Sequence, residues 1–336
     1  MKVLRLGKGG GLEALRVVDE ADPGEPGPGE VRVRVHASSL NFHDLAVVAG
    51  WIPTAEGRIP MADAGGVVEA VGAGVDEFAA GDRVVSGFFP YWQDGQPVRD
   101  DFTLTPGDGI EGHACEVVVR PAAFFTKAPA GYSHVEAATL TTAGVTAWRA
   151  LVVEGRLKAG DTVLALGTGG VSIWALQLGK AMGAEVIVTS SSDAKLARAK
   201  ALGADHAINY RTTPQWAQAV LELTGGRGVD HVVEVGGPGT LPQSIDACRV
   251  GGHIALIGVL TGRSGEIPTG VMMRRQQRLQ GLIVGSRRHQ LDMVRALDRL
   301  TLRPVVDSVF PLERTADAFR HEQAGAHFGK IGLAIG

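Results

Sequence analysis

The stretch LGTGGVS (residues 166–172) directly follows a short apolar run and precedes a stretch with helical periodicity. A glycine turn between a strand and a helix is the arrangement that binds the pyrophosphate of a dinucleotide. The turn needs Gly167, and phosphates can approach the backbone only where Gly169 has no side chain, while the helix start offers free N–H groups. The third glycine of the motif is replaced by Ser172, which is also small. The alternative is a glycine turn in an ordinary βαβ unit.

Around this turn, continuous apolar runs alternate with stretches of helical periodicity. Continuous apolar strands that alternate with helices indicate a parallel sheet covered on both faces. The sequence therefore predicts an α/β fold with a doubly wound parallel sheet over residues 124–287, closed by a last apolar run at residues 279–285. The first helix of this region carries its apolar face at Val171, Trp174, Ala175, Leu178 and Met182. The apolar runs are residues 162–166, 185–189, 206–209, 231–235 and 253–259.

The first part of the chain has a different sequence pattern, in which short β-rich runs are separated by Gly/Pro turns. Residues 30–38 alternate apolar and polar side chains, which is the period of a half-buried antiparallel strand. We predict a β-rich barrel or sandwich domain over residues 1–123. The apolar runs after residue 300 again have the β-rich pattern of the first part of the chain. Residues 288–336 are therefore expected to return to the first domain.

Composition excludes several classes of protein. The 336 residues suit two domains, and 33 basic against 36 acidic residues give a formal charge of −3, which argues against nucleic acid binding. The two cysteines, Cys115 and Cys248, cannot form a disulfide framework or a four-cysteine zinc site. No window approaches the roughly 20 apolar residues of a membrane span. We expect a cytoplasmic protein.

The end of the second strand bears on the choice of cofactor. An NAD site usually has Asp or Glu there to bind the ribose 2′-hydroxyl, but the chain reads Val-Thr-Ser-Ser-Ser over residues 188–192. Lys195 falls in the next first helical turn, where the helix dipole disfavours a cation. Three hydroxyls and a lysine favour the 2′-phosphate of NADP(H). The alternative is a serine N-cap followed by a solvated lysine.

Taken together, five segments make the chain resemble the medium-chain dehydrogenase/reductase superfamily over essentially its full length. The resemblance implies a GroES-like catalytic domain, a Rossmann cofactor domain with the nicotinamide between them, and commonly a homodimer. The segments are GEVRVRVHASSLNFHD (29–44), MADAGGVVEAVGAGV with GDRV (61–84), AATLTTAGVTAWRAL (137–151), the unit from LALGTGG to HAINY (164–210), and HFGKIGL (327–333).

Zinc alcohol dehydrogenases of that family hold their catalytic metal at three positions. Their cysteine corresponds to Asn41, their Gly-His-Glu motif to residues 61–63 (Met-Ala-Asp), and their third ligand falls near Thr141 and Thr142. The region of their structural-zinc loop, residues 87–107, contains no cysteine. His43 is the nearest remaining candidate ligand, and a lone histidine is more often an ordinary loop residue. We therefore expect no metal.

The zinc-free quinone oxidoreductases are the branch that the chain resembles most, through Leu-Asn-x-x-Asp at residues 40–44. The resemblance assigns Asn41 a catalytic place beside the nicotinamide and ribose. Tyr210 would cover the adenosine phosphate together with Ser191 and Lys195, or it simply ends a strand. The cofactor surface implied by the turn and the resemblance comprises Asn41, Thr142, Gly167, Gly169, Gly170, Val171, Ser191, Lys195, Tyr210, Ile257, Val284 and Gly329.

A fold that lacks zinc needs another way to stabilise negative charge on a carbonyl oxygen. The hypothesis is hydride transfer from NADPH to a quinone or an α,β-unsaturated carbonyl, which delocalises that charge. A zinc-free alcohol dehydrogenase or ketone reductase and a non-catalytic NADPH-binding protein remain alternatives. Asp44 and Asp63 are expected to fix backbone rather than to donate protons. The aromatic loop over residues 88–108 is expected to line the substrate cleft, form a subunit contact or pack as a small core.

Overall fold

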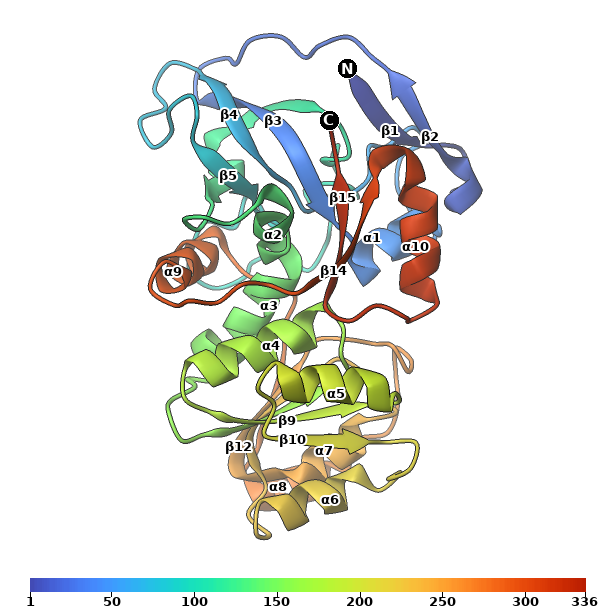
Figure 1. The fold of residues 1–336 in the computed structure, drawn as a ribbon, viewed down its shortest axis with the longest axis vertical. Helices are drawn as coiled ribbons and strands as arrows, with labels where there is room; N and C mark the ends of the chain where they lie inside the picture. Colours follow the sequence, from blue (N-terminus) through green and yellow to red (C-terminus); the bar gives the residue numbers. More distant parts are fainter. The chain divides into compact units, whose positions relative to one another are not determined.

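The chain leaves its first unit at Val145 and returns to it at Val284 in the computed structural model, which describes residues 1–336 (Figure 1). The sequence predicted these crossings at residues 123 and 288, so the first crossing comes later than predicted. The reason is that β7 (Phe125–Lys127) pairs antiparallel with β5 (Arg83–Ser86), and α2 (His134–Ala138) packs against β3 (Glu30–Ser39). Residues 124–145 therefore belong to the first unit.

The first unit is built on a seven-stranded sheet in the order β14-β15-β3-β4-β5-β7, with β6 also paired to β3. Along β3 the side chains alternate in burial as predicted, and Val31, Val33 and Val35 lie in its core. The other elements are the hairpin β1 (Lys2–Leu6) and β2 (Leu15–Asp19), β4 (Gly65–Val71), β6 (Val117–Pro121), β14 (Val306–Pro311), β15 (Lys330–Ala334), α1 (Phe42–Val48), α9 (Arg287–Leu297) and α10 (Thr315–Gln323).

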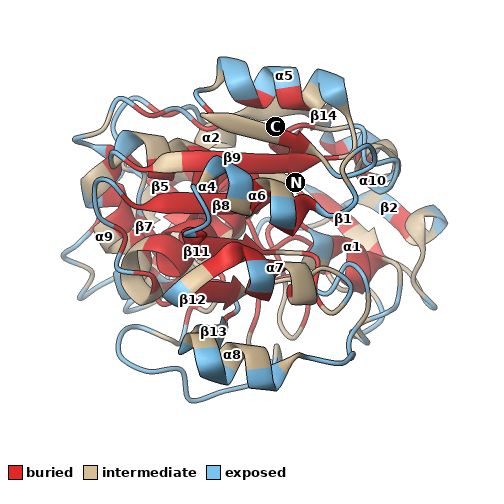
Figure 2. Cartoon of the chain, turned by 90° about the horizontal axis from the view of Figure 1, so that it is seen from below, coloured by how far each residue is buried: buried red, intermediate tan, exposed pale blue.

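The second unit is the predicted α/β domain, with a parallel six-stranded sheet in the order β10-β9-β8-β11-β12-β13. Helices cover the sheet, and Figure 2 shows β8, β9 and β11 as buried strands. No helix of the chain is both long and apolar enough to cross a bilayer. The elements are β8 (Thr162–Leu166), β9 (Glu185–Ser190), β10 (His206–Asn209), β11 (Val229–Glu234), β12 (Cys248–Leu256), β13 (Arg278–Gly281), α4 (Gly170–Ala181), α5 (Asp193–Ala201), α6 (Trp216–Leu223), α7 (Leu241–Ala247) and α8 (Thr269–Arg275), with α3 (Val145–Trp148) at the crossing.

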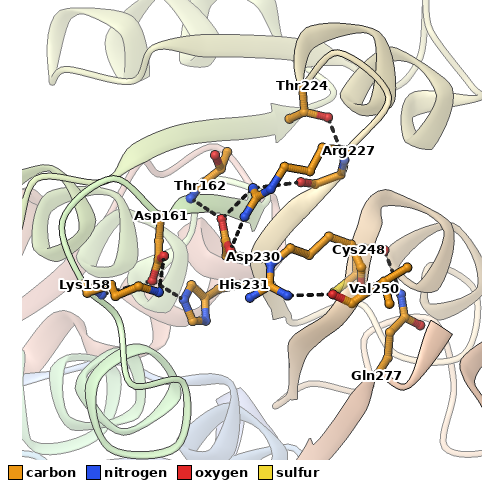
Figure 3. Close-up of polar contacts among 12 residues, drawn as sticks. Lys158, Asp161, Thr162, Thr224, Arg227, Asp230, His231, Cys248, Val250 and Gln277 are labelled. Carbon is orange, nitrogen blue, oxygen red and sulfur yellow. Dashed lines mark hydrogen bonds and ion pairs between the residues drawn. The ribbon is translucent and has the colours of Figure 1, made fainter.

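A buried carboxylate ties together the starting ends of three neighbouring strands of this sheet (Figure 3). Asp230 at the start of β11 accepts hydrogen bonds from the Thr162 N–H on β8 at 2.9 Å and from the Arg249 guanidinium on β12 at 2.5 Å. Burial alone would raise the pKa of Asp230, but these bonds and one from Arg227 hold it well below its usual range. The opposite, carboxyl ends of the strands are where ligands bind in open α/β sheets.

Candidate functional site

The glycine turn lies at the carboxyl end of β8. Gly167 has a φ of 78°, a conformation that favours glycine, and its N–H donates to Thr189 Oγ1 at 3.3 Å. Gly169 caps α4 without any side-chain hydrogen bond, and a Cβ built on it would meet no atom within 4 Å. The backbone beside the helix start is therefore open to a ligand, and these residues fit the pyrophosphate of a dinucleotide.

Ser172 explains how the chain dispenses with the third glycine of the motif. Its side chain is buried in the first turn of α4, and Oγ donates to the Leu166 carbonyl at 2.6 Å. Leu166 is the last residue of β8. The hydroxyl thus satisfies a strand-end carbonyl at the close approach of helix and strand, so serine is accommodated there.

The carboxyl end of β9 carries hydroxyls and no carboxylate. The strand ends at Ser190, and Ser192 is the N-cap of α5, where its Oγ accepts from the Lys195 N–H at 3.4 Å. Tyr210 follows the parallel neighbour β10, is 42% exposed, and its N–H donates to the Ser190 carbonyl at 3.0 Å. The serine N-cap of the alternative interpretation is therefore present, and Ser191, Lys195 and Tyr210 belong to elements whose ends share one edge of the sheet.

The other predicted cofactor residues are distributed over both units. Ile257 follows β12 in the second unit, and its N–H donates to the Glu234 carbonyl at 2.8 Å. Val284 is buried in the first unit with a φ of 44°. Gly329 precedes β15 in the same unit, and a Cβ there would come within 2.5 Å of the Val305 carbonyl oxygen. Glycine at position 329 is thus required by the backbone itself.

Asn41 lies at the centre of a buried hydrogen-bond network in the first unit. It is the N-cap of α1 and is only 8% exposed. Its Nδ2 donates to Asp44 Oδ2 at 3.0 Å and to Asp63 Oδ2 at 2.9 Å, while its Oδ1 accepts from Lys330 Nζ at 2.6 Å. Both ends of the Asn41 amide are therefore bonded within the protein.

Asp63 is the second centre of this network and is completely buried. Ser39 Oγ donates to its Oδ2 at 2.5 Å, and Thr142 Oγ1 donates to its Oδ1 at 2.6 Å. Burial raises the pKa of Asp63, against the lowering effect of the Lys330 ammonium 3.7 Å away. The partners of the Asp63 carboxyl are side chains, so the expectation that it fixes backbone was wrong. We call Ser39, Asn41, Asp44, Asp63, Thr142 and Lys330 the polar cluster.

Asp44 does bond to backbone, as expected, because its two oxygens accept from the N–H groups of Asn41 and Ala62, each at 3.0 Å. Glu322 on α10 adds a third carboxyl group to the surroundings. Burial raises the pKa of Glu322 to about 7, with Lys330 acting to lower it and Asp44 to raise it. The region thus contains one buried ammonium and three carboxyl groups.

Sequence reasoning missed Lys330 and Glu322. Lys330 stands in the HFGKIGL segment of the resemblance, where only its neighbour Gly329 was chosen. No sequence pattern identifies its partner, because Lys330 and Asn41 are 289 residues apart in the chain. Glu322 lies on α10, whose other charged residues are exposed or partly exposed. The helical periodicity of the sequence therefore does not reveal that its Oε2 atom is buried.

The residues at the positions of the zinc ligands do not fit a zinc ion. Catalytic zinc needs three thiolate, imidazole or carboxylate ligands and an open position. At those positions this chain has an amide, a methyl group and a hydroxyl, from Asn41, Ala62 and Thr142. In addition, the Lys330 ammonium donates a hydrogen bond to the Asn41 side-chain oxygen. Residues 1–336 contain no group of three or more His, Cys, Asp or Glu side chains that could hold a metal ion.

The aromatic loop packs around His43. The His43 ring lies 5.1 Å from the Phe88 ring and 4.9 Å from the Phe102 ring, and its Nε2 is 3.4 Å from Asp108 Oδ2. The loop therefore forms a small packed core, one of the three expectations for it. Phe102 and Asp108 also line a pocket of about 500 Å³ together with residues 52–55.

Comparison with known proteins agrees with this architecture. Residues 27–130 match the alcohol dehydrogenase GroES-like domain, and residues 170–301 match the zinc-binding dehydrogenase family. The chain is 41% identical to a zinc-type alcohol dehydrogenase-like protein of Schizosaccharomyces pombe, over 97% of this chain and 96% of that protein. A candidate alcohol dehydrogenase from Sinorhizobium meliloti is 43% identical with a TM-score of 0.90, over 95% of this chain and 94% of that one.

Other solved structures share the fold over nearly the whole chain. An NAD-dependent alcohol dehydrogenase is 37% identical with a TM-score of 0.89 and complete coverage of both chains. A quinone oxidoreductase from Pseudomonas syringae is 29% identical, and a mycobacterial protein complexed with NADPH is 27% identical; both have a TM-score of 0.81 and 99% coverage of both chains. The chain therefore belongs to the medium-chain dehydrogenase/reductase superfamily, a family of oxidoreductases that use a nicotinamide cofactor.

Proposed function

We propose that the protein is an NADPH-dependent oxidoreductase that reduces a quinone or an α,β-unsaturated carbonyl without zinc. The observation that carries this proposal is the Lys330 ammonium bonded to Asn41, among hydroxyl and amide groups at the positions of the zinc ligands. Zinc would polarise a carbonyl oxygen as a Lewis acid. A conjugated acceptor has less need of such polarisation, because it spreads the negative charge over several atoms.

The cofactor choice is supported by the residues at the end of β9. Bound NADPH supplies the hydride. The open backbone at Gly169 and the N-terminus of α4 would hold its pyrophosphate, and Ser191, Lys195 and Tyr210 would contact its 2′-phosphate. Asp193, the first carboxylate after the strand, is the first residue of α5 and accepts from Asn209 Nδ2 at 2.7 Å, which supports a role for it at the helix start rather than on a ribose.

The proposal is tested by following NADPH and NADH oxidation with 1,4-benzoquinone, an enone and a saturated ketone, each with and without a chelator. We expect turnover of the quinone or the enone, with NADPH preferred and the chelator without effect. Loss of activity on chelation would overturn the zinc-free proposal. Turnover of the saturated ketone alone would identify a ketone reductase. Saturable NADPH binding with no turnover of any acceptor would identify a non-catalytic binding protein.

We also propose that two copies of the chain pair along β13. This strand is an edge of the parallel sheet, and an unpaired edge is a template for another strand. Exposed hydrophobic side chains gather in the same part of the sequence, namely Val259, Leu260, Ile267, Met273 and Ile283. Sedimentation should give twice the 35.1 kDa chain mass at micromolar concentration, and Leu260→Glu with Met273→Glu should shift it to one chain mass. A wild-type monomer at that concentration contradicts the pairing.

A further inference from the structure

The proposed reduction needs a proton as well as a hydride, and the inference that follows rests on that proposed function. Hydride addition to a conjugated carbonyl leaves an enolate or phenolate oxygen that must be protonated. The polar cluster and Glu322 bring three carboxyl groups together with a single ammonium group, Lys330. Because unpaired charges are costly to bury, this balance favours a state in which at least one of the three carboxyl groups keeps its proton.

Asp63 is the carboxyl group best placed to keep that proton and to release it. It is completely buried, whereas Thr142, 2.6 Å from its Oδ1, is partly exposed. Its other oxygen lies 2.5 Å from Ser39 Oγ, 2.9 Å from Asn41 Nδ2 and 3.7 Å from Lys330 Nζ. These three donors would stabilise the carboxylate that remains once the proton has left. Asp44 and Lys330 are the charged groups that act on Asp63.

We propose that Thr142 is the catalytic proton donor and that Asp63 is the positioning residue that resupplies its proton. When Asp63 carries a proton on Oδ1, the 2.6 Å hydrogen bond runs from Asp63 to Thr142 Oγ1, and the single proton of the Thr142 hydroxyl can point to the substrate. The Thr142 Oγ–H bond breaks as an O–H bond forms on the enolate or phenolate oxygen. In the same step the Asp63 Oδ1–H bond breaks and its proton restores the Thr142 hydroxyl. Asp63 ends as a carboxylate and takes a proton from water after the product leaves. No electrons beyond the transferred hydride are needed.

The kinetic experiment compares Thr142→Val, which keeps the shape and removes the hydroxyl, with Thr142→Ser, which keeps the hydroxyl. With the best acceptor of the panel above, we expect Thr142→Val to lower kcat about 100-fold, the range of a lost general acid. Because Thr142 is also one of the residues expected to contact the cofactor, kcat is measured at NADPH concentrations that saturate each variant, as determined by fluorescence titration. Thr142→Ser should retain kcat within about fivefold and the solvent deuterium isotope effect of the wild type.

The matched control is Thr139→Val, which removes a threonine hydroxyl that donates to the Glu136 carbonyl at 2.8 Å. It should leave the isotope effect unchanged. Unchanged kcat in Thr142→Val, in an active wild-type enzyme, would overturn the relay and leave the proposed function standing. Equal losses in Thr142→Ser and Thr142→Val would also overturn it. A wild type that reduces no acceptor would overturn both.

A second measurement needs no turnover. The infrared C=O stretch of a protonated carboxyl should be present in the cofactor-free protein at neutral pH. Glu322→Gln should leave the Asp63 component of that band in place, Asp63→Asn should remove it, and Thr142→Val should shift its frequency because the hydrogen-bond partner is lost. A band that Asp63→Asn does not change would place the proton elsewhere and overturn the relay.

Discussion

Replacement of Lys330 by Met is expected to lower the free energy of unfolding by about 3–5 kcal/mol, the cost of removing a buried cation from among buried acceptors and carboxyl groups. The Lys330 side chain is 4% exposed and the Asp63 side chain is fully buried. Lys330 Nζ also donates to the Leu40 carbonyl and to Asn41 Oδ1. Methionine fills much of the same volume, so the expected loss comes from acceptors and carboxylates that remain buried without their cation. Urea unfolding followed by circular dichroism measures it.

Lys127→Met is the matched control in the same unit. Lys127 Nζ is 2.9 Å from Asp82 Oδ2, but its side chain is 57% exposed, and exposed pairs contribute about 0–1 kcal/mol. Adding Glu322→Gln to Lys330→Met should recover part of the loss, because Lys330 also acts on the Glu322 carboxyl group, and that group is then gone. A loss below about 1 kcal/mol for Lys330→Met alone would mean that the ammonium does not stabilise the polar cluster.

The second unit was predictable from sequence because its signals are local. The strands β8 and β9 contain continuous apolar runs, and the glycine turn at residues 166–172 lies between the first of these runs and an apolar helical face. The unit boundary was less predictable. β7 has only three residues, too few to show a period, and it joins the first unit through pairing with β5, about forty residues earlier in the chain. Such non-local pairing has no signature in a single sequence.

The candidate site likewise has one part that the sequence predicts and one part that it does not. The turn at Gly167 and Gly169 and the absence of a carboxylate at the end of β9 could both be predicted, since each depends on neighbouring residues. The polar cluster could not, because Asn41, Asp63 and Lys330 come from three separate segments. Resemblance selected Asn41 for contact with the cofactor, and the structure adds that its amide is bonded at both ends to other residues of the cluster.

Gly169→Asp is expected to abolish cofactor binding while leaving the protein as stable as the wild type or slightly more stable. Gly169 has a φ of −79° and a ψ of −174°, an N-cap conformation that aspartate adopts readily, and a Cβ there meets no atom within 4 Å. The new carboxylate would accept from the free N–H groups of α4 and gain a few tenths of a kcal/mol. It would also place a negative charge where the pyrophosphate must sit. Fluorescence titration should show affinities for NADPH and NADH both reduced at least about 100-fold.

Two variants separate this effect from others. Gly270→Asp adds the same side chain at an exposed glycine in α8 that also has open space around its Cβ, and it should bind both cofactors normally. Lys195→Ala should weaken NADPH about tenfold and leave NADH unchanged, since only NADPH carries the 2′-phosphate. Normal NADPH binding by a folded Gly169→Asp would show that the dinucleotide does not lie on this turn. Aspartate at position 169 would stabilise the start of α4 but would repel the pyrophosphate of the cofactor. This opposition between helix stability and cofactor binding explains why glycine, a poorer N-cap than aspartate, occupies position 169.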